Sequence, residues 1–169
     1  MQTKYYSDNQ RYTSAKTSIN STKVPSLFNK ISWVPDTNNL DYGGGKFNTA
    51  TNYLASKKVR NIIFDPYNQT NEQNRIALSR TNYDTATLSN VLNVIKEKQV
   101  RRNCIINCLA HLKSNGHIYI SVYEGNKSGI GSETLKNSWQ ENRTIKSYME
   151  ELKDFNPSYK NGVITITKH

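Results

Sequence analysis

Three consecutive glycines, Gly43 to Gly45, constrain the fold of this chain more than any other feature. They lie inside the segment Asn38–Leu54, after a stretch expected to be a short buried strand and before a helix that begins near Asn48. Glycine permits a positive φ and lets a ligand lie directly on the backbone, where a Cβ would prevent it. A helix that starts just past such a turn points its free N–H groups into the same space. A glycine-rich hairpin or a flexible loop would give a similar pattern, so the triplet alone does not distinguish these from a ligand-binding turn.

The residues after this helix make the pattern more specific. The next apolar segment, Arg60–Phe64, is predicted as a strand and ends on Asp65-Pro66. In nucleotide-binding α/β folds, an acidic residue at the tip of the strand after the glycine turn holds ribose hydroxyls. Each part is common, but the order of glycine turn, helix, strand and acid predicts a nucleotide-type cofactor site.

Length and composition predict one soluble domain. With 169 residues, 35% of them hydrophobic, the chain is large enough to bury a core. No apolar run approaches membrane-spanning length and the N-terminus has no apolar signal core, so we expect no membrane association and a cytoplasmic location. Cys104 and Cys108 stand four apart in an apolar helical pattern and are expected to be buried thiols. The three scattered histidines predict no metal site.

The chain is strongly basic, with a formal net charge of +10. A basic surface attracts polyanions, so nucleic acid is the first macromolecular partner to consider. The alternative is that the charge only maintains solubility, because the Lys and Arg residues are spread along the chain. The densest clusters are Lys57-Lys58 with Arg60, and Arg101-Arg102.

The chain is expected to divide into an N-terminal extension or lid, residues 1–36, and one cofactor-binding domain, residues 37–169. A short helix is predicted after Pro25, and Pro35-Asp36 interrupts the chain before the first strand. Two interpretations of the extension compete. It is either a frayed tail whose last turn packs on the sheet, or a lid whose polar side chains face the ligand; these are Ser18, Asn20, Ser21 and Lys23.

The rest of the chain alternates between strand and helix patterns. The clearest helix is 97–113, whose apolar residues recur at a spacing of three to four and which Ser114-Asn115-Gly116 ends. Alternation predicts an α/β fold with a mostly parallel sheet covered by helices on both faces. The further expected elements are a short helix at 72–78, strands at 84–90, 117–123 and 162–167, a loop at 124–139 and a helix at 144–155.

These residues resemble the class I, Rossmann-like S-adenosylmethionine-dependent methyltransferases. The family pattern D-x-G-x-G-x-G stands here as Asp41–Phe47, with Phe47 in place of the last glycine, and Asp65 corresponds to the acid after the second strand. Residues 83–95 resemble the fourth-strand region of the family, and residues 112–122 resemble the helix end and strand that follow. The resemblance covers about half of the chain. The segment 90–95, Asn-Val-Leu-Asn-Val-Ile, also resembles methyltransferase-type proteins associated with DNA phosphorothioation.

The chain also departs from the family. Only eighteen residues separate Asp65 from Asp84, too few for the usual helix, third strand and turn. We therefore expect the third strand, whose acidic end contacts adenine in the family, to be missing or reduced. After residue 122 the family has a helix and an antiparallel pair of strands, whereas the pattern here predicts one helix and one strand. The expected fold is a reduced methyltransferase core without a separate substrate-recognition domain.

The resemblance implies S-adenosylmethionine as the cofactor and places its site at the carboxyl ends of the strands. Two residues are candidates for catalysis: Glu124, at the end of a strand, as a general base, and Asn90 beside the acceptor. Ser89 and Asn90 have an alternative role as caps of the following loop, and Trp139 is either a lid anchor or a packed core residue. The expected cofactor-binding residues are Asp41, Gly43, Gly44, Gly45, Lys46, Phe47, Asp65, Pro66, Tyr67, Ser89 and Asn90.

Three functions remain open at this point. The first is a methyltransferase that acts on a small molecule or a nucleic acid. The second is an S-adenosylmethionine-binding protein without transfer activity, such as a sensor, a sequestering agent or an inhibitor. The third is a basic interaction protein that kept the fold and lost the cofactor, since fold does not determine function. We rank them in this order because Asp41, the glycines and Asp65 are all present. The sequence leaves the acceptor and the oligomeric state open.

Overall fold

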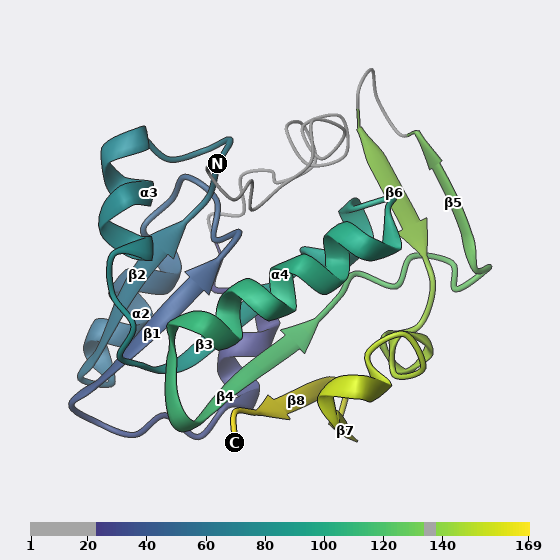
Figure 1. The fold of residues 1–169 in the computed structure, drawn as a ribbon. Helices are drawn as coiled ribbons and strands as arrows, with labels where there is room; N and C mark the ends of the chain where they lie inside the picture. The colour runs from purple at the N-terminus through teal and green to yellow at the C-terminus, as the bar shows by residue number, and fades with distance from the viewer. Residues whose placement is uncertain (1–22, 134–137) are drawn as a thin grey trace, which may run out of the picture.

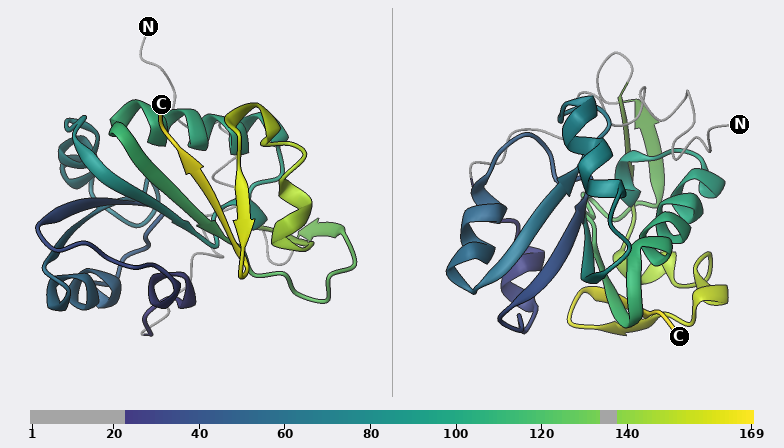
Figure 2. Two further views of the ribbon diagram at one scale, coloured as in Figure 1. Left: turned by 90° about the horizontal axis from the view of Figure 1, so that it is seen from below. Right: turned by 60° about the vertical axis from the view of Figure 1, so that its left-hand side comes forward.

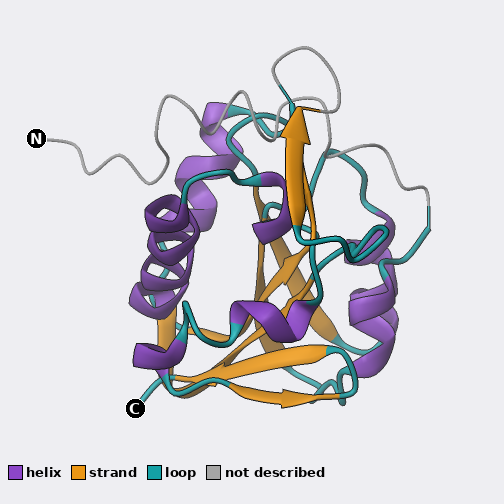
Figure 3. Cartoon of the chain, turned by 90° about the vertical axis from the view of Figure 1, so that its right-hand side faces the viewer, coloured by secondary structure: helices purple, strands orange, loops and turns teal. Residues whose placement is uncertain are grey.

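A computed structural model describes residues 23–133 and 138–169, and in it the chain forms a six-stranded sheet with helices on either side (Figures 1 and 3). The residues proposed to face a ligand from a lid, Ser18, Asn20 and Ser21, lie outside this range. The strands are β1 (Thr37–Tyr42), β2 (Val59–Phe64), β3 (Tyr83–Ser89), β4 (Leu112–Ser121), β5 (Ile130–Glu133), β6 (Trp139–Asn142), β7 (Ser158–Lys160) and β8 (Val163–Thr167). The α-helices are α2 (Thr49–Ser56), α3 (Asn71–Leu78) and α4 (Lys98–His111), and the 3₁₀ turns are η1 (Ser26–Lys30), η2 (Leu92–Val94), η3 (Ile145–Tyr148) and η4 (Lys153–Phe155).

The order of strands in the sheet is β2-β1-β3-β4-β8-β7. The first four are parallel, β8 pairs antiparallel with β4, and β7 pairs antiparallel with β8 at the edge. Because parallel strands share their direction, their carboxyl ends lie along one edge of the sheet, where the turns after β1, β2, β3 and β4 come together. The predicted Rossmann-like, mostly parallel architecture is confirmed.

One face of the sheet packs against α3, α4 and η3 (Figure 2, left). Its strands present apolar residues at alternate positions, such as Leu40, Leu88 and Ile120, which are all fully buried. Helix α4 contributes the predicted apolar stripe, in which Cys104 and Cys108 are buried thiols as expected. This face holds the larger of the two hydrophobic clusters.

The opposite face is covered by α2 and η1. Leu27 and Phe28 of η1 are fully buried beside Leu54 of α2, which shows that the chain before β1 packs on the sheet from Pro25 onward. Between these apolar contacts, the strands themselves present buried polar residues: Asn39, Asp41, Asn61 and Thr87. The two faces therefore differ in chemistry.

The predicted loss of the family's third strand is confirmed. Within the described chain, β2 is followed by α3 alone before β3 begins, and β3 pairs directly with β1. The sheet therefore ends at β2 on that side. None of the described helices has the length and apolar character needed to cross a membrane.

The predictions for the C-terminal third were partly wrong. Residues 144–155 form η3 and η4 rather than one α-helix, with backbone hydrogen bonds mostly from residue i to residue i−3. The spacing of the buried Ile145 and Tyr148 fits both structures, because residues three apart share a face in either. The expected loop 124–139 contains β5 and the start of β6, and the expected single last strand is a hairpin of β7 and β8.

Candidate cofactor site

The glycine triplet forms the turn between β1 and α2 at the carboxyl edge of the sheet. Gly43 and Gly45 have φ angles of 81° and 76°, in the left-handed region that glycine adopts without strain. The Gly43 N–H donates to the carbonyl of Phe64 at 2.7 Å, which joins the turn to the end of β2. A Cβ on Gly44 would lie 2.6 Å from an oxygen of Asp41, so a side chain there would displace that carboxylate. A Cβ on Gly45 would meet nothing within 4 Å among the described atoms. The turn thus rests on Asp41 and presents Gly45 to open space.

Asp65 fastens the glycine turn to β2. Its Oδ2 accepts a hydrogen bond from the Gly45 N–H at 2.9 Å, and its Oδ1 accepts from the N–H groups of Tyr67 and Asn68, both at 3.0 Å. The Gln69 amide reaches back to the Gly45 carbonyl at 2.9 Å. The Asp65 side chain is almost completely buried by these contacts. A carboxylate oxygen has two lone pairs, so Oδ2 can accept one hydrogen bond beyond that of Gly45.

Asp41 lies beneath the turn with only 2% of its surface exposed. The Asn61 amide and the Thr87 hydroxyl donate to its two oxygens at 3.4 and 3.2 Å. Burial raises the pKa of the Asp41 carboxyl to about 6, against the opposing effect of these two hydrogen bonds, and the nearby charge of Asp65 adds to the rise. Asp41 therefore changes its charge close to neutral pH.

The structure gathers the other predicted cofactor residues around this turn. Lys46 and Phe47 are exposed at the start of the segment that leads into α2, and the Lys46 ammonium lies 5.4 Å from the centre of the Phe47 ring. Pro66 and Tyr67 are half-buried and follow Asp65 directly. The group from Asp41 to Phe47 and the group from Asp65 to Tyr67 therefore border one region.

Ser89 and Asn90 end β3 at the same edge of the sheet. Asn90 has a left-handed φ of 58°, which asparagine tolerates better than most residues, and its N–H donates to the Ser121 carbonyl at 3.0 Å. Its side chain is exposed. These contacts make Asn90 the residue that turns the chain from β3 into η2, and its proposed role in catalysis stays a prediction.

Glu124 follows β4 and is held by the next part of the chain. Its Oε2 accepts a hydrogen bond from the Ile145 N–H, the first residue of η3, at 2.7 Å, and its Oε1 lies 3.9 Å from the Lys127 ammonium. A carboxylate at this place satisfies a free N–H at the start of a helical turn. The structure gives Glu124 a structural role, and its role as a general base stays a prediction.

Sequence reasoning did not find the residues that join η2 to β6. Asn93 is almost fully buried, and its amide donates to the Gln140 side chain at 3.0 Å. Its carbonyl oxygen has no hydrogen-bond partner among the residues that the structure describes. The Lys96 ammonium lies 5.0 Å from the centre of the Trp139 ring, so Trp139 is packed against the chain after η2. No local pattern predicts these contacts, because they join the β5–β6 hairpin to a turn more than forty residues earlier.

The basic pair Arg101-Arg102 has internal partners rather than a free surface. Arg101 is 5% exposed and lies 2.9 Å from Glu151, which also binds Arg143 at 2.6 Å. Arg102 donates to the Glu151 carbonyl at 2.6 Å and to Asp154 at 3.1 Å. One of the two basic clusters that favoured a polyanion partner therefore binds acidic and carbonyl groups within the protein.

Comparisons with known proteins add evidence on the fold. A scan against protein-family models and a search of the curated proteins both find no match. Among solved structures, the chain is similar to 1,6-didemethyltoxoflavin-N1-methyltransferase of Burkholderia thailandensis, with bound 1,6-didemethyltoxoflavin and S-adenosylhomocysteine. The TM-score is 0.61 at 18% identity, over 79% of this chain and 72% of that one.

Two further structures match over more of their length. A methyltransferase of Methanosarcina mazei gives a TM-score of 0.59 at 16% identity, over 85% of this chain and 97% of that one. A TehB-like methyltransferase of Corynebacterium glutamicum gives 0.53 at 15% identity, over 95% of each chain. All three are described as methyltransferases, and two of them as S-adenosylmethionine-dependent. The chain therefore has the fold of class I S-adenosylmethionine-dependent methyltransferases.

Proposed function

We propose that the protein is an S-adenosylmethionine-dependent methyltransferase. The observation that carries the proposal is the glycine turn fastened to Asp65, at the carboxyl edge of β1 and β2 in a methyltransferase fold. The sulfonium methyl group is already activated, so the protein needs mainly to hold the cofactor and an acceptor in line and to exclude water. This demand agrees with the small size of the core.

The residues present fit this cofactor. Gly45 faces open space, so the methionine part of the cofactor can approach the backbone there. Oδ2 of Asp65 accepts the Gly45 N–H, and its second lone pair is where we propose that a ribose hydroxyl donates. Since the third strand of the family is missing, Pro66 and Tyr67 are the residues that we propose to border the adenine.

We propose a small molecule as the acceptor. The Burkholderia structure holds a small acceptor-like molecule, 1,6-didemethyltoxoflavin, beside S-adenosylhomocysteine. The internal pairing of Arg101 and Arg102 removes one reason to expect nucleic acid. Asn90 and Glu124, at the ends of β3 and β4, are the proposed residues on the acceptor side.

Calorimetry of the full chain with S-adenosylmethionine and S-adenosylhomocysteine tests the cofactor. Both should bind, whereas adenosine triphosphate, which shares the ribose and adenine, should bind more weakly because it lacks the methionine part that we propose to lie against Gly45. A matched control is Asp154→Asn, which changes an exposed acid far from the turn and should bind like the natural protein. No measurable binding of either cofactor form would refute the proposal.

The acceptor class is tested by salt dependence. Binding of duplex or single-stranded DNA that falls by orders of magnitude between about 50 and about 200 mM salt would support a nucleic-acid acceptor and contradict our choice. We expect weak binding at low salt, with the remaining exposed cluster Lys57, Lys58 and Arg60 as its source. The variant Lys57→Gln/Lys58→Gln should then remove that weak binding without changing calorimetry with S-adenosylmethionine.

A second function is a cofactor-binding protein without transfer activity. It is favoured by the engagement of Glu124 with η3, because one oxygen of this carboxylate already accepts the Ile145 N–H. A transfer assay with radiolabelled methyl donor and a panel of small amines, phenols and heterocycles separates the two. Tight binding of S-adenosylmethionine without transfer to any member would favour the second function.

A further inference from the structure

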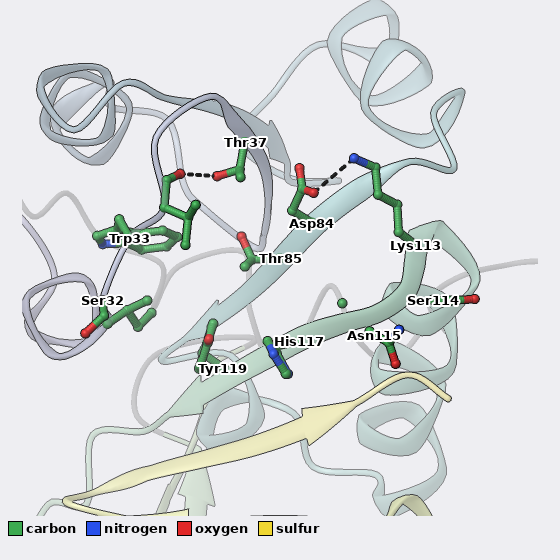
Figure 4. A pocket seen from close by; sticks show the side chains of 13 residues that line it. Ser32, Trp33, Thr37, Asp84, Thr85, Lys113, Ser114, Asn115, His117 and Tyr119 are labelled. Carbon is green, nitrogen blue, oxygen red and sulfur yellow. Dashed lines mark hydrogen bonds and ion pairs between the residues drawn. The ribbon is translucent and has the colours of Figure 1, made fainter.

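A hollow of about 300 Å³ lies at the edge of the sheet opposite to the glycine turn (Figure 4). It is formed where β1, β3 and β4 begin, and the segment before β1 closes it from one side. Its volume is at the lower end of the range of roughly 300–1,000 Å³ that small-molecule sites occupy. The lining residues are Ile31, Ser32, Trp33, Val34, Thr37, Asp84, Thr85, Lys113, Ser114, Asn115, Gly116, His117 and Tyr119.

Flat side chains form much of the wall. Trp33, His117 and Tyr119 line the hollow, and the rings of His117 and Tyr119 lie 6.0 Å apart. Burial raises the pKa of the Tyr119 hydroxyl, so this side chain is neutral at physiological pH. Planar apolar surface of this kind favours a flat ring as the occupant.

Three polar side chains of the wall, Trp33, Thr37 and Thr85, already donate their hydrogens within the protein. The Trp33 indole N–H and the Thr37 hydroxyl donate to backbone carbonyls at 2.9 and 2.6 Å, and the Thr85 hydroxyl donates to the Asn39 side chain at 2.7 Å. Asp84 is paired with Lys113 at 3.0 Å, so neither sign of charge dominates. The hydroxyl oxygens of Thr37 and Thr85 remain as acceptors, which suits a ligand that donates hydrogen bonds and carries no charge.

A chain of buried side chains leads from Thr85 to Asp41. Asn39, fully buried, donates from its amide nitrogen to Asn61 at 2.9 Å and to Thr87 at 3.0 Å. Asn61 and Thr87 then donate to the two oxygens of Asp41 at 3.4 and 3.2 Å. The donations in this series point from the hollow toward Asp41, and the Asn61 amide also donates to the Thr51 hydroxyl at 3.1 Å. Hydrogen bonds in such a series polarise one another, so a bond accepted at Thr85 strengthens those that follow.

We propose that the hollow is a second ligand site, for a flat uncharged heteroaromatic molecule with an amino group. We propose also that binding there affects the glycine turn through the hydrogen-bonded side chains from Thr85 to Asp41. The ligand's amino group donates to the oxygen of Thr85. The strengthened donations from Asn61 and Thr87 hold the Asp41 carboxylate, on which Gly44 rests. The inference does not depend on the proposed function, because the turn itself reports the effect.

The experiment is an amide NMR titration of the full ¹⁵N-labelled chain with 2-aminoquinoxaline. Signals of Thr85, Gly116 and His117 should shift, and those of Gly43 to Gly45 should shift with the same concentration dependence. Quinoxaline, which has the ring without the amino group, should bind about three- to tenfold more weakly, the effect of one hydrogen bond between neutral groups. Quinoxaline-2-carboxylate should bind no better than quinoxaline.

Three variants separate binding from transmission. Thr85→Val should lower the affinity for 2-aminoquinoxaline to that of quinoxaline and abolish the response of the turn. Thr87→Val lies outside the hollow, so the affinity should stay within twofold while the response of Gly43 to Gly45 falls by about half or more, since one of two branches is lost. Thr87→Ser keeps the hydroxyl and should restore the response, which also controls for an effect of Thr87→Val on folding. Ser114→Ala is the matched control. Ser114 lines the hollow but takes no part in the series of hydrogen bonds from Thr85 to Asp41, so this variant should respond like the natural protein.

Several results would overturn the proposal. Signals at the hollow that do not move, or move equally with all three probes, exclude the site as described. Movement at the hollow without movement at Gly43 to Gly45, or an undiminished turn response in Thr87→Val, excludes the transmission. Movement at the turn alone places the probe at the glycine turn and excludes the hollow.

Discussion

The two faces of the central sheet have opposite chemistry. The face toward α3 and α4 is apolar across β1, β3 and β4, with Leu40, Leu88 and Ile120 fully buried. The face toward α2 and η1 combines a hydrophobic cluster with buried polar residues: Asn39 binds Asn61 and Thr87, and these two bind Asp41. Buried apolar area stabilises without direction, whereas buried hydrogen bonds contribute little net free energy and require one arrangement. The comparison teaches that one face supplies stability while the other sets the position of the glycine turn.

The largest expected effect is on stability of the apolar face. Ile120→Ala removes a fully buried side chain and should lower the free energy of unfolding by about 2–5 kcal/mol. Thr87→Val on the polar face keeps the volume and leaves donors and acceptors unpaired, so it should cost about 1–3 kcal/mol. Denaturant unfolding measures both, and Ile106→Ala on the exposed side of α4 is the control. A larger loss of unfolding free energy in Thr87→Val than in Ile120→Ala would mean that the polar face contributes more to stability than the apolar face.

The next effect is the dependence of the unfolding free energy on pH, which we expect from Asp41 on the polar face. The pKa of Asp41 is raised by burial from its ordinary 3.8 to about 6, so the folded protein keeps a proton that the unfolded chain releases. Stability from this group is therefore full below pH 3.8 and is lost as the pH rises to about 6, by about 3 kcal/mol in total.

Asp41→Asn should remove this contribution. The difference in unfolding free energy between the natural protein and Asp41→Asn should change across this pH range and be constant above it. The measurement is urea unfolding of both proteins at a series of pH values. A difference that is flat through the whole range would show that Asp41 titrates in the folded protein as it does in the unfolded chain.

Asp65→Ala tests whether the polar edge holds the cofactor. Loss of a charge-assisted hydrogen bond to the ribose should weaken S-adenosylmethionine by roughly 1–3 kcal/mol, measured by calorimetry. The same change also frees Gly45, so Gln69→Leu is the matched control, because it removes a contact to the Gly45 carbonyl and leaves the carboxylate. Unchanged affinity in Asp65→Ala would mean that the ribose is held elsewhere.

The smallest expected effect concerns Glu124, which lies outside both faces. Its carboxylate caps η3, and loss of a cap costs about 0.5–2 kcal/mol. Glu124→Gln should lower the unfolding free energy by no more than this, because the amide oxygen can still accept the hydrogen bond. If Glu124 also acts as a base, turnover should fall much more than affinity for S-adenosylmethionine, because a group that acts only in the transition state changes rate. Parallel falls in turnover and stability would leave Glu124 with its structural role alone.

Local patterns were sufficient for the parallel part of the fold. The glycine turn, α2, β2 and α4 were predicted within a few residues, because each depends on short-range features: positive φ at Gly43, an unbroken apolar run in β2 and helical spacing in α4. The absence of a third strand followed from the number of residues between Asp65 and Asp84, which no turn chemistry can extend. The C-terminal third was harder, because residues three apart share a face in both α and 3₁₀ geometry.

The sequence by itself determined the order of elements, the glycine turn and the acid that follows β2. Only the tertiary structure decided that Arg101 is buried against Glu151, that Glu124 caps η3, and that Asn39 joins Asn61 and Thr87 beneath the turn. The physical reason is range. A turn or a helix depends on neighbours along the chain, whereas the polar contacts of Asn39 join residues 22 and 48 positions apart, and they form only after strand register has been set by packing of the whole sheet.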